Sequence, residues 1–452
     1  MQKSIINQLI LKVQESFDKL SLAVPISVSE SLALFVYRCM IGKHRTFHTP
    51  EHVLKVCKGL QHPIQILATL FHDVVYYQVD NGFGPETSVL LADYVVQEGK
   101  AVTIKRDFPE EEVLLLCLDV FGYQPGEDVR VQGFNEFLST LVAIHLLKPY
   151  LSQRNLLGIM VGIEGTIPFR GRDEAGKNCF ERMEDRLVLL NDKYQLGIKP
   201  THIDLMLQLA VEIANKDVEN FSEANVAEFL DNTWRLLPET NNHLAVANVY
   251  TVRSYRQALQ KIEAFMNFVP ADYVFQQYRQ TPDADTFRQM KMQAQENIDT
   301  AREYLQAKLA SIAILEALAQ VSGGDAPMSM FIGDLRHNHA LQAIERAEDY
   351  LPAVALSDEF EYNPAVLKLL EFGRASILDF DMQNAPISYF VYASLGKALT
   401  TDYLQLARQM FEGQMKAEDY LAALPAAILS ALARACAQVS VSRQEALRTF
   451  YS

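Results

Sequence analysis

The stretch that decides the fold runs from His48 to Glu86 and reads HTPEHVLKVCKGLQHPIQILATLFHDVVYYQVDNGFGPE. Its apolar residues recur at helical spacing, and side chains that suit metal ligation stand among them. Those side chains are His48, His52, His72, Asp73 and Glu86. Imidazole with carboxylate suits Mn, Fe, Co, Ni or Zn, and carboxylate with water also suits Mg. The stretch therefore predicts helices that hold a divalent metal ion.

The spacing of the apolar residues predicts that two of these histidines face the protein core. Ile64 and Ala68 precede His72 at steps of four, and Val56 follows His52 at the same step. Residues four apart lie on one face of an α-helix, and an apolar face packs against the core. We therefore expect both imidazoles on the inward faces of their helices.

A distant carboxylate has the same kind of setting. Leu205, Leu209 and Ile213 precede Asp217 at steps of four, so Asp217 continues an apolar stripe. A buried, unpaired carboxylate is very costly, and a metal ion is one of the few partners that offset the cost. The predicted metal ligands are His52, His72, Asp73 and Asp217.

This pattern resembles the HD superfamily of metal-dependent phosphohydrolases. Its members have a histidine followed four residues later by an aliphatic residue, then a helix that ends in His-Asp, then a distant Asp on another helix. The corresponding positions here are His52 with Val56, His72 with Asp73, and Asp217. The resemblance covers roughly residues 40–220 and implies an all-α fold and a divalent metal cofactor.

One branch of that superfamily has a further histidine four residues before the first, and this chain has His48 there. Thr49 stands where the family usually has Asn. The resemblance implies that His48 protonates the leaving oxygen of a phosphoester, because free imidazole titrates near neutral pH. Asp73 would ligate the ion and orient the attacking water. The alternative for His48 is a loop histidine exposed to solvent.

Three further positions have less distinctive settings. Glu86 either hydrogen bonds to the water that the metal activates or is an ordinary acid at the start of a helix. Thr166 and Arg170 lie in a Gly-rich loop with few acids, which suits a phosphate, with a solvated loop as the alternative. His145 follows Leu141 by four on an apolar helix, which favours a core histidine.

The composition is that of an ordinary globular protein. The 452 residues include 49% hydrophobic and 21% charged residues, with a net charge of −15. This charge argues against binding to a nucleic-acid backbone but permits a small phosphorylated substrate. Five scattered cysteines form no disulfide framework. Because neither a signal-peptide core nor a membrane-spanning apolar run is present, we expect a cytoplasmic protein without membrane contact.

Alternating strand patterns are nearly absent, so the predicted fold class is all-α. We expect an HD-type domain with N-terminal helices at 1–240, a helical extension at 241–322 and a helical C-terminal region of unknown role at 323–452. The linker would lie at Val321–Pro327, which is rich in Gly, Ser and Pro. A helix that opens at Glu86 is expected to continue through Val95.

The function that these expectations favour is metal-dependent hydrolysis of a phosphoester in a nucleotide or another small phosphorylated metabolite. The enzyme would be a phosphomonoesterase or a phosphodiesterase. The alternative is a non-catalytic HD scaffold that senses a nucleotide or a metal and acts through its C-terminal helices. A purely structural helical protein would leave the four inward polar residues unexplained. The oligomeric state and the choice of metal stay open.

Overall fold

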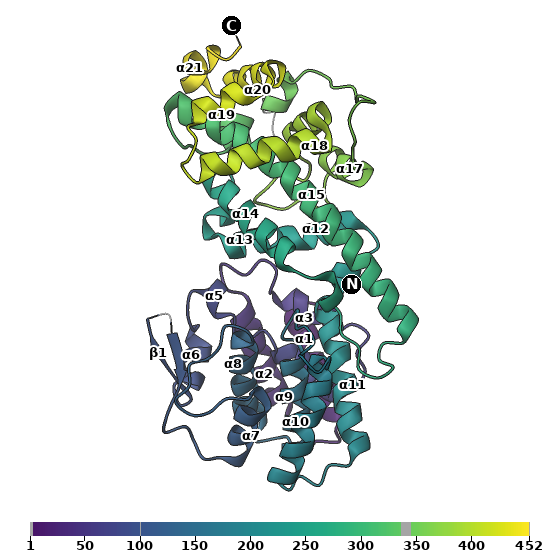
Figure 1. Ribbon diagram of the computed structural model, residues 1–452. Coiled ribbons are helices and arrows are strands. Elements are labelled where there is room, and N and C mark those ends of the chain that lie inside the picture. Colours follow the sequence, from purple (N-terminus) through teal and green to yellow (C-terminus); the bar gives the residue numbers. More distant parts are fainter. Residues whose placement is uncertain (1–2, 100, 336–344, 452) are drawn as a thin grey trace. The chain divides into compact units, whose positions relative to one another are not determined.

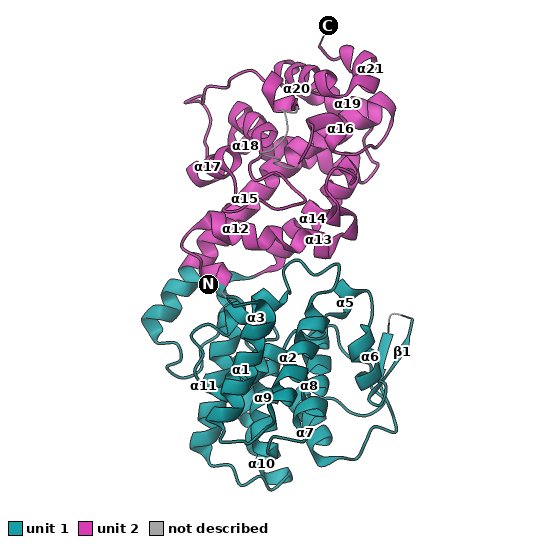
Figure 2. Cartoon of the chain, turned by 180° about the vertical axis from the view of Figure 1, so that it is seen from behind, with its two compact units in different colours: residues 1–219, 270–292 teal, residues 220–269, 293–452 magenta. Residues whose placement is uncertain are grey.

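The computed structural model describes residues 3–99, 101–335 and 345–451, and it confirms the predicted all-α class (Figure 1). The chain forms two compact units. Unit 1 comprises residues 1–219 and 270–292, and unit 2 comprises residues 220–269 and 293–452 (Figure 2). Within the described part of the chain, no helix is both long enough and apolar enough to cross a membrane.

The helices of unit 1 alternate with short loops. They are α1 (Ile5–Lys19), α2 (Ile26–Met40), α3 (Pro50–Val56), α4 (Pro63–Phe71), α5 (Tyr77–Asp80), α6 (Pro85–Leu91), α7 (Glu112–Phe121), α8 (Phe134–Leu147), α9 (Gln153–Gly165), α10 (Cys179–Lys193) and α11 (Pro200–Asp217). Proline at the first position starts α3, α4, α6 and α11, because its fixed φ suits that place and no N–H is needed there.

Helix α4 is the centre of unit 1. Each of its residues from Pro63 to Phe71 is buried, and it packs against α1, α8 and α9, while α11 packs on α9. His62 caps its N-terminus by accepting a hydrogen bond from Ile64 N, and Gln65 Oε1 accepts one from the backbone N–H of His62. A helix buried all round is fixed in place, so the His-Asp pair that follows it is fixed too.

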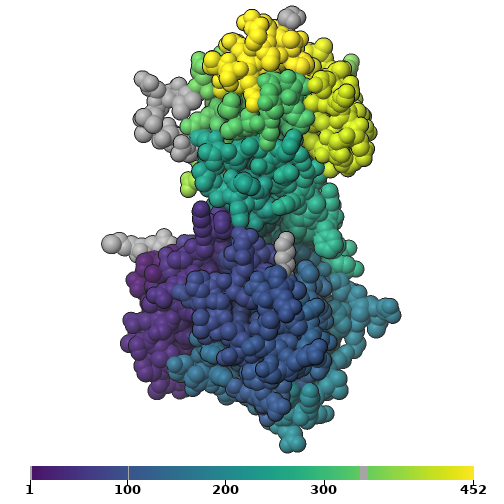
Figure 3. Space-filling model, turned by 90° about the vertical axis from the view of Figure 1, so that its left-hand side faces the viewer, coloured from purple at the N-terminus to yellow at the C-terminus, as the bar shows by residue number. Residues whose placement is uncertain are grey.

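A β-hairpin replaces the end of one expected helix. Helix α6 ends at Leu91, and strands β1 (Val95–Glu98) and β2 (Ala101–Ile104) pair antiparallel, with Val95 opposite Ile104. The expectation of a helix through Val95 was wrong because β-branched residues cluster on both sides of Gly99, whose φ is +63°. In Figure 3 the blue part of the chain covers much of the visible face of unit 1.

The helices of unit 2 surround one long helix. They are α12 (Val226–Trp234), α13 (Leu236–Thr240), α14 (Val252–Phe268), α15 (Ala284–Gly323), α16 (Ser329–Ile332), α17 (Pro364–Phe372), α18 (Pro386–Phe411), α19 (Ala417–Ala423), α20 (Ala426–Val439) and α21 (Gln444–Arg448). The residues of α15 from 293 onward belong to unit 2. Most residues of this part of α15 are buried.

The boundaries between the units differ from those expected at 240 and 322. The chain changes units after residues 219, 269 and 292, so the Gly-rich segment after α15 lies inside unit 2. Arg443 ties that segment down by donating to the carbonyl oxygens of Ala319 at 2.8 Å and Gly324 at 2.6 Å. Gly323 and Gly324 have positive φ and end helix α15. A glycine pair of this kind is typical of a helix C-terminus as well as of a linker between domains.

Candidate metal centre

The four predicted ligands come from the start of α3 and from the C-terminal ends of α4 and α11. His52 is in the first turn of α3, where Thr49 occupies the N-cap position and Pro50 begins the helix. His72 caps the C-terminus of α4 and Asp73 follows it. Asp217 is the last residue of α11. Helix ends place side chains at a junction, so these elements can present four ligands to one point.

The ligand atoms lie within 4.8 Å of one another, as a single metal ion requires. His52 Nε2 and His72 Nε2 lie 3.0 and 3.2 Å from Asp217 Oδ1. The same two nitrogens lie 3.6 and 3.1 Å from Asp73 Oδ2. Two imidazole nitrogens and two carboxylate oxygens are a donor set that fits Zn, Mn, Fe, Co or Ni.

A hydrogen bond sets the tautomer of His72. Its Nδ1 lies 2.7 Å from the carbonyl oxygen of Thr69, which can only accept, so Nδ1 carries the proton. In the neutral ring the lone pair is then on Nε2, which faces the carboxylates of Asp73 and Asp217. Metal-binding histidines usually have such a backbone or carboxylate partner on the other nitrogen. His72 is therefore oriented for ligation before any ion binds.

The charges of the cluster favour binding of a cation. Burial lowers the pKa of His72, but the charges of Asp73 and Asp217 outweigh this and raise it well above its usual value. Burial raises the pKa of the two carboxyls, but the charges and hydrogen bonds of the neighbouring histidines, His72 foremost, together lower it further, so the pKa of each carboxyl lies below its usual range. In the absence of an ion, the positive charge beside the two ionised carboxylates is the proton on His72. A divalent ion that displaces this proton can supply the positive charge instead.

Arg45 contacts the backbone of the cluster, and no pattern in the sequence indicated it. The residue is 5% exposed. Its Nη1 donates to the carbonyl oxygen of Asp73 at 2.7 Å, while Nε and Nη2 bind the two oxygens of Asp80 at 2.9 and 2.6 Å. An arginine in a loop has no periodicity from which burial can be predicted. Its contacts fix the backbone of Asp73, one of the predicted ligands.

His48 flanks the centre. Its ring stacks on Tyr76 with centroids 4.1 Å apart and meets the ring of His52 edge-on at 5.9 Å. The side chain is half-buried. These contacts hold the imidazole beside the ligands but outside the four-atom cluster, as a proton donor to a bound substrate would have to be. Tyr76 was not singled out from the sequence.

Glu86 has a different partner from the one expected. It lies in the first turn of α6, and its Oε1 is 3.8 Å from Nη1 of Arg38. That contact does not join it to the four ligands, so its catalytic role stays a prediction.

His145 donates to or accepts from the hydroxyl of Tyr94 at 2.8 Å, as a hydrogen-bonded core histidine does.

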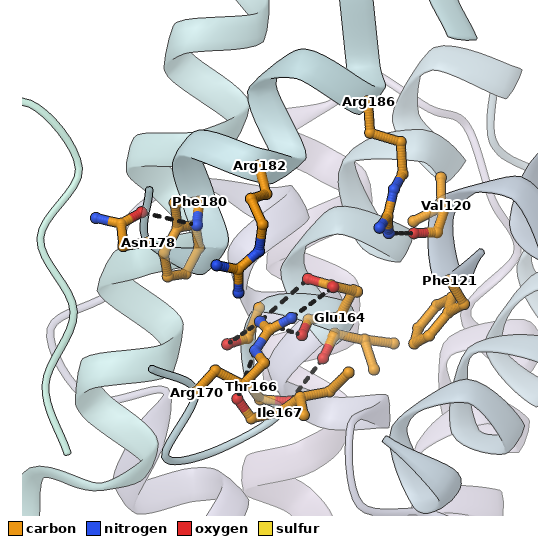
Figure 4. Close-up of polar contacts among 12 residues, drawn as sticks. Val120, Phe121, Glu164, Thr166, Ile167, Arg170, Asn178, Phe180, Arg182 and Arg186 are labelled. Atoms are coloured by element: carbon orange, nitrogen blue, oxygen red, sulfur yellow. Dashed lines mark hydrogen bonds and ion pairs between the residues drawn. The ribbon is translucent and has the colours of Figure 1, made fainter. Parts of the chain in front are cut away.

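Thr166 and Arg170, the predicted phosphate-binding residues, form hydrogen bonds and ion pairs within the protein. Arg170 forms a two-pronged ion pair with Glu164, with Nη1–Oε1 at 2.6 Å and Nη2–Oε2 at 3.2 Å, and donates to nearby carbonyl oxygens (Figure 4). Thr166 is buried and donates to the carbonyl oxygen of Ile163 at 2.7 Å. These contacts close the turn after α9. Substrate binding by Thr166 and Arg170 therefore gains no support from the geometry.

Glu136 is a further residue that sequence reasoning missed. Burial raises its pKa to about 7, and the charges of Asp73 and Asp217 add to the increase. It lies on α8, where Ser139, one turn later, donates to the carbonyl oxygen of Val75 and accepts from its N–H. The polar residues Glu136, Ser139 and Thr140 within a mostly apolar helix were the available signal.

Comparisons with protein-family models, curated proteins and solved structures find no significant match to this chain.

Proposed function

We propose that this protein is a metal-dependent phosphohydrolase that acts on a nucleotide or another small phosphorylated metabolite. The observation that carries the proposal is the convergence of His52, His72, Asp73 and Asp217 within 4.8 Å, from segments far apart in the sequence. The order and spacing of these residues are those that resemble the HD superfamily. A purely structural role leaves two carboxylates and two imidazoles packed together without a compensating ion.

The four ligands would hold one divalent ion, which lowers the pKa of a bound water and neutralises charge on phosphoryl oxygens. The chain's own residues supply the rest. The hydrogen bond from His72 to Thr69 keeps the second imidazole nitrogen directed at the ion. Arg45 holds the backbone of Asp73 in place. His48, oriented by its stacking on Tyr76, donates a proton to the leaving oxygen.

The test is an activity screen on the purified full-length protein. Nucleoside monophosphates, cyclic nucleotides and bis(p-nitrophenyl) phosphate are supplied with Mn, Co, Ni, Zn or Mg. We expect hydrolysis of at least one substrate with at least one metal. Asp217→Asn should reduce it by more than the roughly 100-fold that loss of an outer partner of a metal ligand costs.

Glu51→Gln is the matched control, because Glu51 is an exposed acid one residue from His52 in the same helix. It should retain the activity and the metal content of the wild type. A metal-loaded wild type that hydrolyses none of these esters contradicts the proposal. So does an Asp217→Asn variant as active as Glu51→Gln.

A further inference from the structure

Unit 1 contains a cavity of about 280 Å³ between α4, α9 and α11. The cavity is separate from the candidate metal centre, because the four predicted ligands are not among its lining residues. Its walls are mostly apolar, and they include Leu20, Ile64, Leu205, Met206, Leu209 and Ile213. Apolar walls of this extent favour an occupant that has an apolar body.

One wall of the cavity is the apolar stripe of α11 that the sequence predicted to face the core. Ile213 is 1% exposed, Leu209 is half-buried and Leu205 is 43% exposed. Exposure thus rises toward the N-terminal end of α11, so the cavity is closed near Ile213 and open near Leu205. His202, which also lines the cavity, precedes Leu205 by three residues and lies at this open end.

Three polar side chains that line the cavity have no partner within the protein. Nδ1 of His202 is buried, yet it forms no hydrogen bond with any residue that the structure describes. Among the same residues, the side chains of Arg154 and Asn155 form neither a hydrogen bond nor an ion pair. A buried nitrogen without a partner is costly, and a polar group of a ligand can satisfy it.

The surroundings of the cavity are positively charged in a chain whose net charge is −15. Arg154 lines the cavity, and no acid is among its lining residues in the described part of the chain. Glu212 contacts the lining residue Gln65, but its carboxylate accepts the amide of Gln65 at 2.6 Å. Burial lowers the pKa of His62, another lining residue, and the charge of Lys19 lowers it further. Two cations therefore stand close to the cavity, which favours an anionic group in the ligand.

We propose that this cavity binds a medium-chain fatty acid, with its carboxylate at Arg154 and His202 and its alkyl chain against the stripe of α11. The carboxylate oxygens accept hydrogen bonds from the guanidinium of Arg154 and from Nδ1 of His202 in the tautomer that carries a proton there. The alkyl chain covers the part of the stripe that the protein leaves exposed. No metal ligand takes part, so this binding is independent of the proposed hydrolase activity.

The size of the cavity limits the length of the alkyl chain. An apolar protein cavity of about 150 Å³ holds the six carbons of benzene, so a cavity of about 280 Å³ holds roughly eleven heavy atoms. The wall of α11 from His202 to Ile213 is about 16 Å long, at about 1.5 Å for each residue. Both limits suit fatty acids of roughly eight to ten carbons and exclude the longer chains of membrane lipids.

Calorimetric titration of the full-length protein with decanoate, below its micellar concentration, tests the proposal. EDTA is present throughout, so that no metal ion in the candidate centre recruits the carboxylate. We expect saturable binding and a higher Tm. Acetate, which lacks the apolar chain, and decyltrimethylammonium, which has the opposite charge, should bind much more weakly. Equal affinity for decanoate and decyltrimethylammonium overturns the proposal, as does the lack of saturable decanoate binding.

Two substitutions at exposed positions test the two parts of the ligand. Leu205→Glu places a negative charge at the open end and should abolish decanoate binding, whereas Leu189→Glu, at an exposed leucine of α10, should not. Arg154→Met should weaken decanoate binding by roughly fivefold or more and leave binding of uncharged octanol unchanged. Arg106→Met, at another exposed arginine of unit 1, is its control. A variant that binds decanoate as its control does overturns the proposal.

A crystallographic measurement on the wild type does not depend on the folding of a variant. Crystals grown with terminally brominated decanoate should show anomalous density for bromine near Ile213, at the closed end of the cavity. The carboxylate should lie near Arg154. Bromine density only elsewhere on the protein, or none at all, refutes the site.

Discussion

A Cβ atom added to Gly162 of α9 would lie 2.9 Å from the Cβ of Ala68 on α4 and 3.1 Å from Cδ1 of Ile213 on α11. Ala68 is one helical turn before His72, and Ile213 is one turn before Asp217. The missing side chain of Gly162 therefore permits α4 and α11, the helices that position His72 and Asp217, to pack closely against α9. The site depends on a residue that touches no ligand.

Gly162→Ala should lower the free energy of unfolding by about 1–3 kcal/mol, because the new methyl group overpacks a filled core. It should also weaken metal binding, since the helices must separate at the level of the ligands. Isothermal titration with Zn or Mn and urea denaturation measure the two effects. Gly158→Ala is the control: its Cβ would meet Ile64 at 2.9 Å, farther from the ligands. Equal metal affinity in both variants contradicts this role of Gly162.

The sequence predicted the four-residue cluster because helical spacing reports which face of a helix is buried. The steps of four before His72 placed it on an inward face. On α11 the same argument held only near the end of the helix, because Ile213 is buried while Leu205 is 43% exposed, yet the structure brings Asp217 to His72. Spacing carries no information about contacts in loops. Arg170 lies in a loop that reads as polar and open, but the chain turns back there and its charge is neutralised by Glu164. Which residue pairs with a charged side chain in a loop depends on the path of that loop.

Arg45→Met should destabilise the protein by about 3–5 kcal/mol, because it leaves Asp80 and the carbonyl oxygen of Asp73 without their buried partner. Urea denaturation of the metal-free protein measures the loss. Arg154→Met replaces an exposed arginine of the same unit and should change the stability by less than about 0.5 kcal/mol. A similar small change in both variants would show that the contacts of Arg45 contribute little.

Glu136 should make the metal-free protein less stable as the pH rises. Its pKa is about 7 in the folded protein and about 4.3 in an unfolded chain. Its contribution is therefore fully present below about pH 4 and is lost as the pH rises through 7. At about 1.4 kcal/mol for each pKa unit, the loss is at most about 4 kcal/mol.

Glu136→Gln cannot ionise, so its free energy of unfolding should fall less than that of the wild type between pH 4.5 and 8. Urea denaturation in EDTA across this range gives the comparison. Glu174→Gln, at an exposed position, should follow the wild-type curve. Parallel curves for the wild type and Glu136→Gln would mean that Glu136 ionises at its ordinary pH.

The last prediction separates an enzyme from a sensor, and it concerns His48. The ring stacks on Tyr76 and lies beside His52 but outside the ligand cluster. His48→Ala should therefore keep its metal and lose the proton donor. Activity on a nucleoside phosphoester should fall by roughly 10²–10⁴-fold, the usual range for a positioned acid. The loss on a nitrophenyl ester should be smaller, because nitrophenolate leaves without a proton. Equal losses on the two esters, or unchanged rates on both, would remove His48 from this role. No hydrolysis of either ester by the metal-loaded wild type would favour a sensor over an enzyme.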